Sequence, residues 1–575
     1  MGFVTAFGSA RRAMAAALSI ALVLASAPAA YADNSDSVIY LDQGWSPELR
    51  ELFYFTPQGS HLFPYDWFLA LEQPESEDLF ASPENLARFG WTYHSDDSGR
   101  LNPGGLPIGF TREPDFAPGG GNWMGMTCAA CHTGTVRASG KTVRIDGGPS
   151  MSDFGGFLTA LSRAVTVSHP AVNPDKFARF AGRVLGDQVS PATVQSLAQA
   201  YLAFAVRFGG RAWMRTPPLH AGPGRVDALT QIVNSLTVFD LGQPENLHPP
   251  AAPTSYPFLW LTPKLDWVQW NPIASNPMSR NSGQVLGVFG EANFGLDQTT
   301  PHFTSSIRLK NLHELELWIN DLEPPIWRED LFGSIDETQW RTGQTLFESN
   351  CRGCHNMPPF EMTPKEENIV GKQFIRITRI PYQRVGTDPL YVQGLISRFV
   401  QTGALAEPLF EGRETVLGAE FFTKTVGAAL RRAMDDADLS QQERLAYSDY
   451  RFYAKNDPSD PDEPLRSYSP PSFDTLKAGP LLGIWATGPF LHNGSVPNVF
   501  ELLSPPEERS TEFWVGGRDL DVDRLGYDSS EAHDRFRFDA TLPGNRNAGH
   551  AYPKRPFTPE ERFAVIEFLK NPVRF

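Results

Sequence analysis

The sequence predicts a mainly α-helical protein of two domains with long loop-rich insertions. Two observations support this fold class: a Cys-x-x-Cys-His pentapeptide occurs twice, and apolar residues recur at helical spacing around the second copy. The length of 575 residues also exceeds that of one small domain. We expect an N-terminal domain at 33–335, with an aromatic-rich middle segment, and a C-terminal domain at 336–575.

Each pentapeptide places two thiols three residues apart and a histidine directly after the second. The two copies use all four cysteines of the chain. They comprise Cys128, Cys131 and His132 in the first copy and Cys351, Cys354 and His355 in the second. This spacing is typical of covalent c-type haem attachment, in which the sulfurs bond the porphyrin vinyl groups and the imidazole becomes an axial iron ligand. We therefore predict two covalently bound haem c groups.

Two other interpretations of the cysteine pairs fit less well. A zinc site needs four nitrogen or sulfur ligands in one tetrahedron, which would join the distant motifs without explaining the histidine after each second cysteine. A redox dithiol leaves the same histidines unexplained.

Helix-start signals occur on both sides of the second motif. Asp336 is placed to cap a helix that leads to the motif, with a glutamine at the third helical position. Thr558 is placed to cap a terminal helix, with proline at its first position and Glu561 at its third. Two such helices cross in a cytochrome c module, so we expect two cytochrome c-like haem domains, the second with an insertion at about 360–475.

The remaining segments differ in composition. Residues 33–118 are rich in Pro, Gly and aromatics and predict loops and short helices, whereas 174–208 has helical spacing. The aromatic residues of 210–335 either pack a core, line a haem pocket or bridge two haems. A helix over 305–322 is expected to end this segment, where Pro324 stops it.

The amino terminus predicts a secretory signal peptide at 1–32. Two arginines precede an apolar run at 13–27, and Ala30-Tyr31-Ala32 fits an A-x-A cleavage site. The run is shorter than the ~20 residues that a bilayer span needs. We expect a mature chain starting near Asp33, without a stable membrane span, in the periplasm or secreted; c-type haem attachment outside the cytoplasm agrees with export.

The net charge of −16 and the pI near 5.3 argue against nucleic acid or an anionic membrane as a partner. A basic patch would be needed to bind either of them. A periplasmic electron-donor protein is compatible with this charge.

The sixth iron ligand separates electron carriers from enzymes, because an open iron position admits peroxide or dioxygen. Ten histidines lie outside the motifs, and two stand out by context. His492 lies in the glycine-rich stretch 487–495, and His550 lies in a loop just before the terminal helix. In cytochrome c modules the sixth ligand commonly comes from that side.

At this point a resemblance adds to the argument. The two motifs, together with the stretches 280–291 and 487–494, resemble the bacterial di-haem cytochrome c peroxidase and MauG superfamily. Three further segments are similar to its larger branch, which includes the haem-dependent rubber oxygenases: 106–111, 256–260 and 285–290. The similarity covers most of the mature chain.

The resemblance implies that the N-terminal haem is the peroxidatic one, with His132 as its proximal ligand. Glu291 then occupies the position of the distal glutamate that moves the peroxide proton, and an apolar pocket would raise its pKa for this task. Trp270 is the nearest match to the tryptophan that relays electrons between the haems, with Trp267 as the second choice.

The resemblance also implies a structural Ca²⁺, held partly by the backbone carbonyls of Thr487 and Pro489, with His492 near the haem edge. No methionine follows His492, so we expect His550 to complete a His355/His550 low-spin haem as in the rubber-oxygenase branch. The mobile distal histidine of some peroxidases has no counterpart soon after the first motif.

These expectations rank three functions. The first is an exported peroxidase-like oxidoreductase that reduces H₂O₂ at the N-terminal haem with electrons from the C-terminal haem. The second is a haem-dependent dioxygenase that cleaves a hydrophobic polymer or lipid, which would need an apolar pocket around Phe289 and against which Glu291 argues. The third is a non-catalytic di-haem electron carrier or sensor, which would need two six-coordinate irons.

Overall fold

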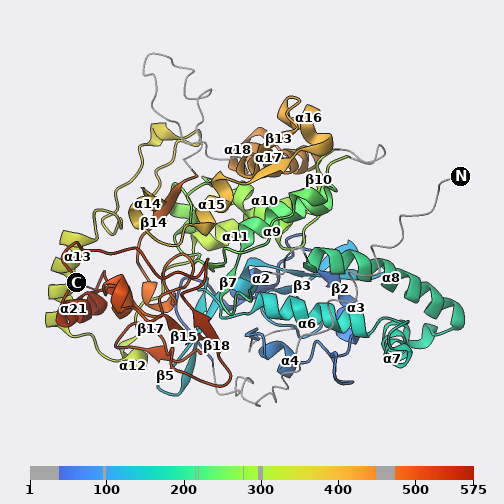
Figure 1. The fold of residues 1–575 in the computed structure, drawn as a ribbon, viewed down its shortest axis with the longest axis horizontal. Helices are drawn as coiled ribbons and strands as arrows, with labels where there is room; N and C mark the ends of the chain where they lie inside the picture. Colours follow the sequence, from blue (N-terminus) through green and yellow to red (C-terminus); the bar gives the residue numbers. More distant parts are fainter. Residues whose placement is uncertain are drawn as a thin grey trace, which may run out of the picture.

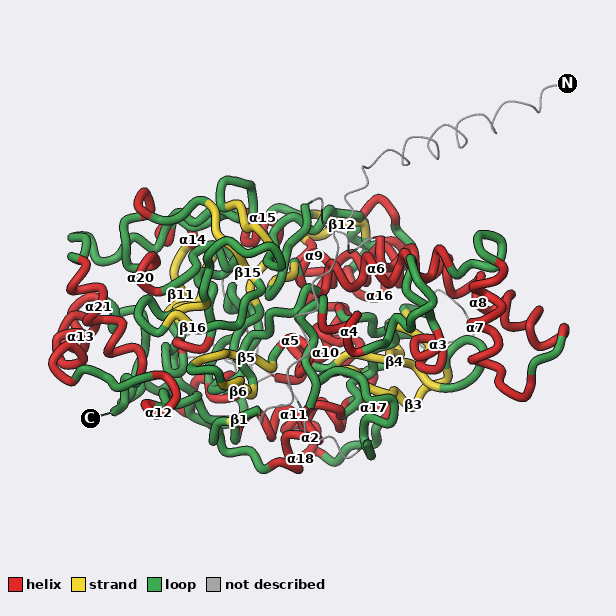
Figure 2. The backbone as a smooth tube through the Cα atoms, turned by 90° about the horizontal axis from the view of Figure 1, so that it is seen from below, coloured by secondary structure: helices red, strands yellow, loops and turns green. Residues whose placement is uncertain are grey.

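The computed structural model describes residues 38–574, except 95–98, 214, 216, 218, 276, 296–301 and 448–472. The predicted signal peptide lies outside these residues. None of the described helices is long and apolar enough to cross a membrane. The molecule is elongated: α13 (Glu337–Asn350) and α21 (Pro559–Lys570) lie at one end, and α7 (Pro174–Leu185) and α8 (Pro191–Trp213) lie at the other (Figures 1 and 2).

Helices α13 and α21 start where the sequence predicts. The carboxylate of Asp336 accepts a hydrogen bond from the third backbone N–H of α13. Thr558 and Glu561 form a complete capping box at the start of α21. Both predicted helix starts are therefore confirmed.

These two helices pack closely against one another. Phe568 on α21 lies 5.3 Å from Trp340 and 5.0 Å from Phe347, measured between ring centroids. Gly343 is needed at the crossing because a Cβ there would lie 1.9 Å from the carbonyl oxygen of Ala564. The predicted crossing of a cytochrome-like helix pair is thus present at the second motif.

The prediction of a mainly α-helical fold is wrong. Small sheets of two or three strands accompany the helices throughout the described residues. Near the first motif the orders are β2-β4-β3 and β1-β6-β5. Their strands are β1 (Ile39–Tyr40), β2 (Phe63–Pro64), β3 (Phe110–Phe116), β4 (Asn122–Met126), β5 (Thr133–Ala138) and β6 (Lys141–Asp146). Buried segments that do not form a helix must pair their backbone groups elsewhere, and aromatic and β-branched residues suit strands.

The first motif lacks the helix pair of the second. It begins in the one-turn helix α5 (Cys128–Cys131), directly between β4 and β5. Strand β5 is antiparallel to β6, and β1 is parallel to β6. The first haem motif therefore lies in a strand-rich setting and not in a helical cytochrome module.

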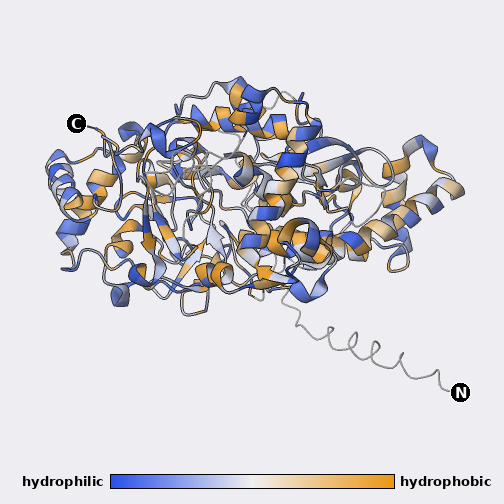
Figure 3. Cartoon of the chain, turned by 90° about the horizontal axis from the view of Figure 1, so that it is seen from above, coloured by the Kyte–Doolittle hydropathy of each residue, from blue (hydrophilic) through white to orange (hydrophobic). Residues whose placement is uncertain are grey.

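Helices surround the strand-rich centre. Short helices occur in 33–118 as expected, and the predicted helical region after residue 174 forms α7 and α8. The helix predicted at 305–322 is α11, with shorter bounds. The main helices are α2 (Pro47–Phe55), α3 (Tyr65–Ala70), α4 (Pro83–Ala87), α6 (Phe154–Val167), α9 (Ala228–Asn234), α10 (Pro277–Gly287), α11 (Leu309–Asn320), α15 (Leu390–Ile396), α17 (Gly418–Asp436) and α18 (Gln441–Ala446). Hydrophobic and hydrophilic residues alternate along many of them, as in amphipathic surface helices (Figure 3).

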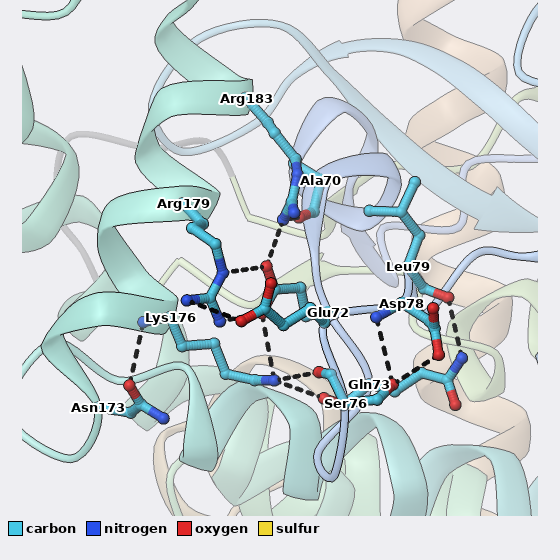
Figure 4. A network of polar contacts seen from close by, with 11 residues as sticks. Ala70, Glu72, Gln73, Ser76, Asp78, Leu79, Asn173, Lys176, Arg179 and Arg183 are labelled. Atoms are coloured by element: carbon cyan, nitrogen blue, oxygen red, sulfur yellow. Dashed lines mark hydrogen bonds and ion pairs between the residues drawn. The ribbon is translucent and has the colours of Figure 1, made fainter.

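A buried ion network anchors α7 to the loop that follows α3 (Figure 4). Glu72 is fully buried, and its carboxylate accepts hydrogen bonds from Arg179 and Arg183. Lys176 lies 3.3 Å from the same carboxylate and donates to the carbonyl oxygens of Gln73 and Ser76. The buried carboxylate is thus paired with three cations, which offsets the cost of burying its charge.

The largest hydrophobic core contains residues from both sides of position 335. The indole N–H of Trp260 donates to the carbonyl oxygen of Leu482 at 2.8 Å. Trp327 packs edge-on against Trp485, with ring centroids 5.4 Å apart. These contacts join the segments around the two motifs in one continuous core. The predicted domain boundary between residues 335 and 336 stays a prediction.

Candidate haem sites

Both motif histidines are oriented by a backbone carbonyl. The Nδ1 atom of His132 donates to the carbonyl oxygen of Pro257 at 2.7 Å, and that of His355 donates to Gly479 at 2.8 Å. A carbonyl only accepts hydrogen bonds, so the proton is on Nδ1 and Nε2 keeps its lone pair. Histidines that bind metals are usually held in this way. Each imidazole is therefore prepared to ligate iron through Nε2.

Burial keeps both imidazoles neutral. It lowers the pKa of His132 to about 4 and also lowers the pKa of His355. Burial raises the pKa of Cys131 to about 12 and that of Cys351 to about 11. These thiols differ from redox or zinc-binding cysteines, whose pKa is lowered. In the part of the chain that the structure describes, no group of three or more His, Cys, Asp or Glu could hold a metal ion.

A cavity of about 240 Å³ adjoins the second motif. His355, Cys351 and Cys354 line it on one side, and His550 and His492 also reach it. Its remaining wall is mainly apolar, with Phe347, Leu476, Phe490, Leu503 and Leu569 among the lining residues. Two cysteines, facing imidazoles and an apolar wall fit a haem c.

The spacing of two rings supports an iron between them. The ring centroids of His355 and His550 lie 6.3 Å apart, with the ring planes at 57°. A metal–imidazole bond is about 2.0–2.1 Å long and the ring centre lies about 1.2 Å further, so two imidazoles on opposite sides of one metal have centres about 6.4 Å apart. The spacing of His355 and His550 is compatible with such a pair, and their pairing on one iron stays a prediction.

His550 is held in an unusual backbone conformation. Its φ is +48°, and its backbone N–H donates to the carbonyl oxygen of Val385 at 2.8 Å. Gly549 precedes it with φ +82°, where a Cβ would lie 2.3 Å from the backbone nitrogen of Thr387. Burial, helped by His355, lowers the pKa of His550 to about 3, and its Nδ1 is buried without a protein partner. The ring is therefore neutral and available as a ligand.

His492 and Trp270 line the same cavity. His492 is buried, and burial lowers its pKa to about 4. The indole N–H of Trp270 donates to the carbonyl oxygen of Ser255 at 3.0 Å. Trp267 is buried outside the cavity lining, under the guanidinium of Arg379. Of the two tryptophans, Trp270 therefore lines the cavity at the second motif and Trp267 does not.

A short segment lies between the two motifs. Pro257 accepts the hydrogen bond from His132 and also lines the cavity at the second motif, together with Tyr256 and Phe258. The carbonyl oxygens of Pro257 and Gly479 were not predicted as site groups, because a backbone acceptor has no signal in the sequence. The aromatic density of this region was the available signal for Tyr256 and Phe258.

Glu291 lies in a charged cluster. Its carboxylate forms an ion pair with Arg207 and lies 3.4 Å from Nδ1 of His61 and 3.7 Å from Arg211. Burial would raise the pKa of Glu291, but the neighbouring His61 imidazole and the two arginines outweigh it and lower the pKa to about 2. The expectation of a raised pKa is therefore wrong. The contacts described for Glu291 do not include the first motif, so its distal role stays a prediction.

Phe289, which the dioxygenase hypothesis needs as pocket wall, is fully buried. Its ring lies 4.2 Å from the guanidinium carbon of Arg215 and 5.1 Å from that of Arg211. It therefore belongs to a core flanked by arginines beside Glu291.

The predicted calcium ligands Thr487 and Pro489 also line the cavity. The side-chain hydroxyl of Thr487 donates to the carbonyl oxygen of Ile484 at 2.8 Å. This hydrogen bond does not involve the backbone carbonyl of Thr487, which is the predicted calcium ligand. Calcium prefers oxygen ligands of this kind. The calcium site stays a prediction.

Comparisons with known proteins agree with the second motif. Residues 476–515 match a protein family described as RoxA-like, cytochrome c-like. The chain is 33% identical over 590 residues to the uncharacterized protein y4iJ of Sinorhizobium fredii (strain NBRC 101917 / NGR234), an alignment that covers 93% of each chain. It is 22% identical over 339 residues to the uncharacterized protein y4iM of the same strain, which covers 58% of this chain and 64% of that protein.

The family match has two consequences. A cytochrome c-like segment implies haem c and haem-dependent oxidoreductase chemistry. It covers one cytochrome c-like domain, at the C-terminal site, so the prediction of two such domains is wrong. The strand-rich setting of α5 is the physical reason, because it replaces the crossed helices that define the module.

Proposed function

The chain belongs to the same family as the Sinorhizobium fredii protein y4iJ, and from that premise we propose that it is an exported di-haem c-type oxidoreductase with peroxidase-like activity. The haem groups would supply the redox chemistry, with H₂O₂ reduced at the N-terminal site by electrons relayed from the C-terminal site. Reduction of H₂O₂ to two waters takes two electrons and two protons, which a periplasmic electron-donor protein and the solvent would supply.

The observation that carries this proposal is the difference between the two motif histidines. His355 faces His550 at 6.3 Å, whereas the ring contact described for His132 is with Tyr256 at 6.2 Å. Two strong protein ligands favour electron transfer, whereas an open sixth position would admit a small oxidant. This asymmetry supports chemistry at the first motif and electron storage at the second.

The residues between the motifs are suited to electron relay. The hydrogen bond from His132 reaches the carbonyl oxygen of Pro257, and the indole of Trp270 is bonded to the carbonyl oxygen of Ser255, two residues earlier. The side chain of Trp270 also borders the C-terminal cavity. Trp270 is therefore the proposed relay between the two sites.

Glu291 is proposed to accept the first peroxide proton. An ionised carboxylate can act as a base, and the pKa of about 2 keeps it ionised at neutral pH. Release of that proton to the second oxygen would be favoured because Arg207 and His61 stabilise the ionised form. The carboxylate is about one-third exposed, so water can exchange protons with it.

A dioxygenase acting on a hydrophobic polymer or lipid is the second candidate. Two observations favour it: the matched family is RoxA-like, and the lowered pKa of Glu291 leaves it ionised at neutral pH, with no proton of its own to deliver to bound dioxygen. In this reading the apolar residues around the first motif would exclude water from bound dioxygen.

Two further expectations accompany the proposal. Export to the periplasm would allow covalent haem attachment. A Ca²⁺ bound by the carbonyls of Thr487 and Pro489 would stabilise the loop that carries His492.

The purified holoprotein provides the test. Haem content per chain is measured first, and two haems are expected. The ferric spectrum should contain one high-spin and one low-spin component, and the reduced protein should consume H₂O₂ with oxidation of both. Two low-spin haems that do not react with peroxide would exclude both enzyme functions. Oxygen uptake with polyisoprene, without peroxide turnover, would select the dioxygenase.

A further inference from the structure

The cavity at the second motif is lined by a lysine whose ammonium group has no ion-pair partner among the described residues. Lys477 lies in β14 (Thr475–Ala478) and is one of the residues that line the cavity. Its backbone N–H donates to the carbonyl oxygen of Trp270 at 2.8 Å. Among the described residues its ammonium group makes no hydrogen bond or ion pair. An ammonium in a mainly apolar wall is unfavourable unless an anion meets it.

Neighbouring charges do not supply that anion. The nearby carboxylate is Asp266, and its Oδ1 atom already accepts the backbone N–H groups of Trp267 and Ile377. Arg280, the other nearby cation, forms a buried ion pair with Glu316. Burial, reinforced by Arg280, lowers the pKa of Lys477 to about 8, so the group is still mainly charged at neutral pH.

A second polar group without a hydrogen-bond partner lies next to Trp270. The hydroxyl oxygen of Ser255 is buried without a hydrogen-bond partner, and Ser255 lines the same cavity. The carbonyl oxygens of Ser255 and Trp270 are both used, by Trp270 and Lys477 respectively. Lys477 and Ser255 are therefore each joined to Trp270 by a hydrogen bond, and both residues line the cavity.

We propose that Lys477, assisted by the hydroxyl of Ser255, binds a propionate carboxylate of the haem attached at the second motif. This inference rests on the proposed haem c at Cys351 and Cys354. A carboxylate supplies the anion that Lys477 lacks and the acceptor that Ser255 lacks. Because a positive charge stabilises the reduced, more electron-rich haem, Lys477 also raises the reduction potential of the site beside the Trp270 relay.

The reduction potential of the low-spin haem tests this role, measured by spectroelectrochemistry on the full-length holoprotein. Lys477→Gln should shift the potential downward, Ser255→Ala should shift it less in the same direction, and Lys477→Arg should retain it. Lys424→Gln is the matched control, because Lys424 lies on α17 and pairs with Glu420. Its potential should equal that of the unmodified protein.

Separate outcomes distinguish this inference from the proposed function. Haem content and the low-spin spectrum are measured for each variant before its potential. An unmodified protein without covalent haem would overturn the proposed function itself. A normal haem content with an unshifted potential in Lys477→Gln would overturn only the propionate contact. If Lys477→Gln fails to fold, the other two variants decide. The propionate contact would be overturned if Ser255→Ala leaves the reduction potential unshifted and Lys477→Arg shifts it.

Discussion

The ring centroids of His355 and His550 lie 6.3 Å apart, although 194 intervening residues separate the two in the sequence. The two rings reach the cavity from different elements, one after α13 and one from the loop before α21. Because α13 and α21 cross at Gly343, the helix pair sets the distance between the two ligands. The packing of two helices is therefore part of the proposed iron site.

Replacement of His550 tests this site directly. His550→Ala should convert the low-spin spectral component to a high-spin one, while the haem stays attached through Cys351 and Cys354. His492→Ala is the matched control, since both histidines are buried or half-buried and line the same cavity. We expect the control to keep the low-spin spectrum. If the low-spin spectrum survives in His550→Ala and disappears in His492→Ala, the second ligand is His492 and not His550.

The helix signals at the second motif could be read from the sequence because they are local. Asp336 and Thr558 act within three residues of their own positions. The place of His550 before the terminal helix also suggested it as a ligand, and that role stays a prediction. Strand pairing is different: Phe63 pairs with Met124 and Ile39 with Val143, and no local pattern in the sequence specifies such distant partners. The strand-rich setting of the first motif was missed for this reason.

The environment of Glu291 was missed for a related reason. Its position after a recognisable stretch could be matched from the sequence, but its pKa depends on Arg207 and His61, which lie far away along the chain. The opposite expectation, a raised pKa, followed from assuming an apolar pocket. Partners of a charge are set by tertiary structure.

Trp270 should affect electron relay without affecting haem content. Trp270→Phe removes the indole N–H that bonds to Ser255, and we expect peroxide turnover to fall at least about tenfold, equivalent to about 1.4 kcal/mol in the barrier. Trp267→Phe, a buried position outside the cavity lining, is the control and should change turnover little. Steady-state peroxide consumption with a chemical reductant measures both. Equal turnover in the two variants would remove Trp270 from the relay.

Glu291 should affect the peroxide reaction itself. Glu291→Gln cannot accept a proton, so the reaction should slow by about 10²–10⁴-fold if general base catalysis operates there. Stopped-flow absorbance after peroxide addition measures the rate. An unchanged rate would remove Glu291 from the mechanism.

The partner Arg207 gives an independent check through the pH profile. Arg207→Gln removes one of the charges that lower the pKa of Glu291, so this pKa should rise from about 2. The base is active only when ionised, so activity is lost as the pH falls through its pKa. The acid limb of the pH–rate profile should therefore move to higher pH in Arg207→Gln. If the acid limb of the pH–rate profile does not move in Arg207→Gln, the group that titrates in this limb is not Glu291.

The buried network around Glu72 should govern acid stability. Hydrogen bonds from Arg179 and Arg183 lower the pKa of Glu72 from 4.5 to about 2, against the effect of burial. A lowered carboxylate pKa stabilises the fold above pH 4.5, and this stability is lost as the pH falls from 4.5 through about 2. The shift corresponds to about 3 kcal/mol of unfolding free energy at neutral pH.

The stability of two glutamate variants tests this contribution. Glu72→Gln should lower the unfolding free energy by about 3 kcal/mol at pH 7, because three cations lose a shared buried carboxylate. Glu75→Gln is the control: Glu75 pairs with Arg163 at the exposed surface, and the loss should be less than about 1 kcal/mol. Chemical denaturation of the holoproteins at pH 7 and pH 4 measures both. The difference between the Glu72 variant and the unmodified protein should shrink at pH 4, and a constant difference would show that the carboxylate acts through packing and not through its charge.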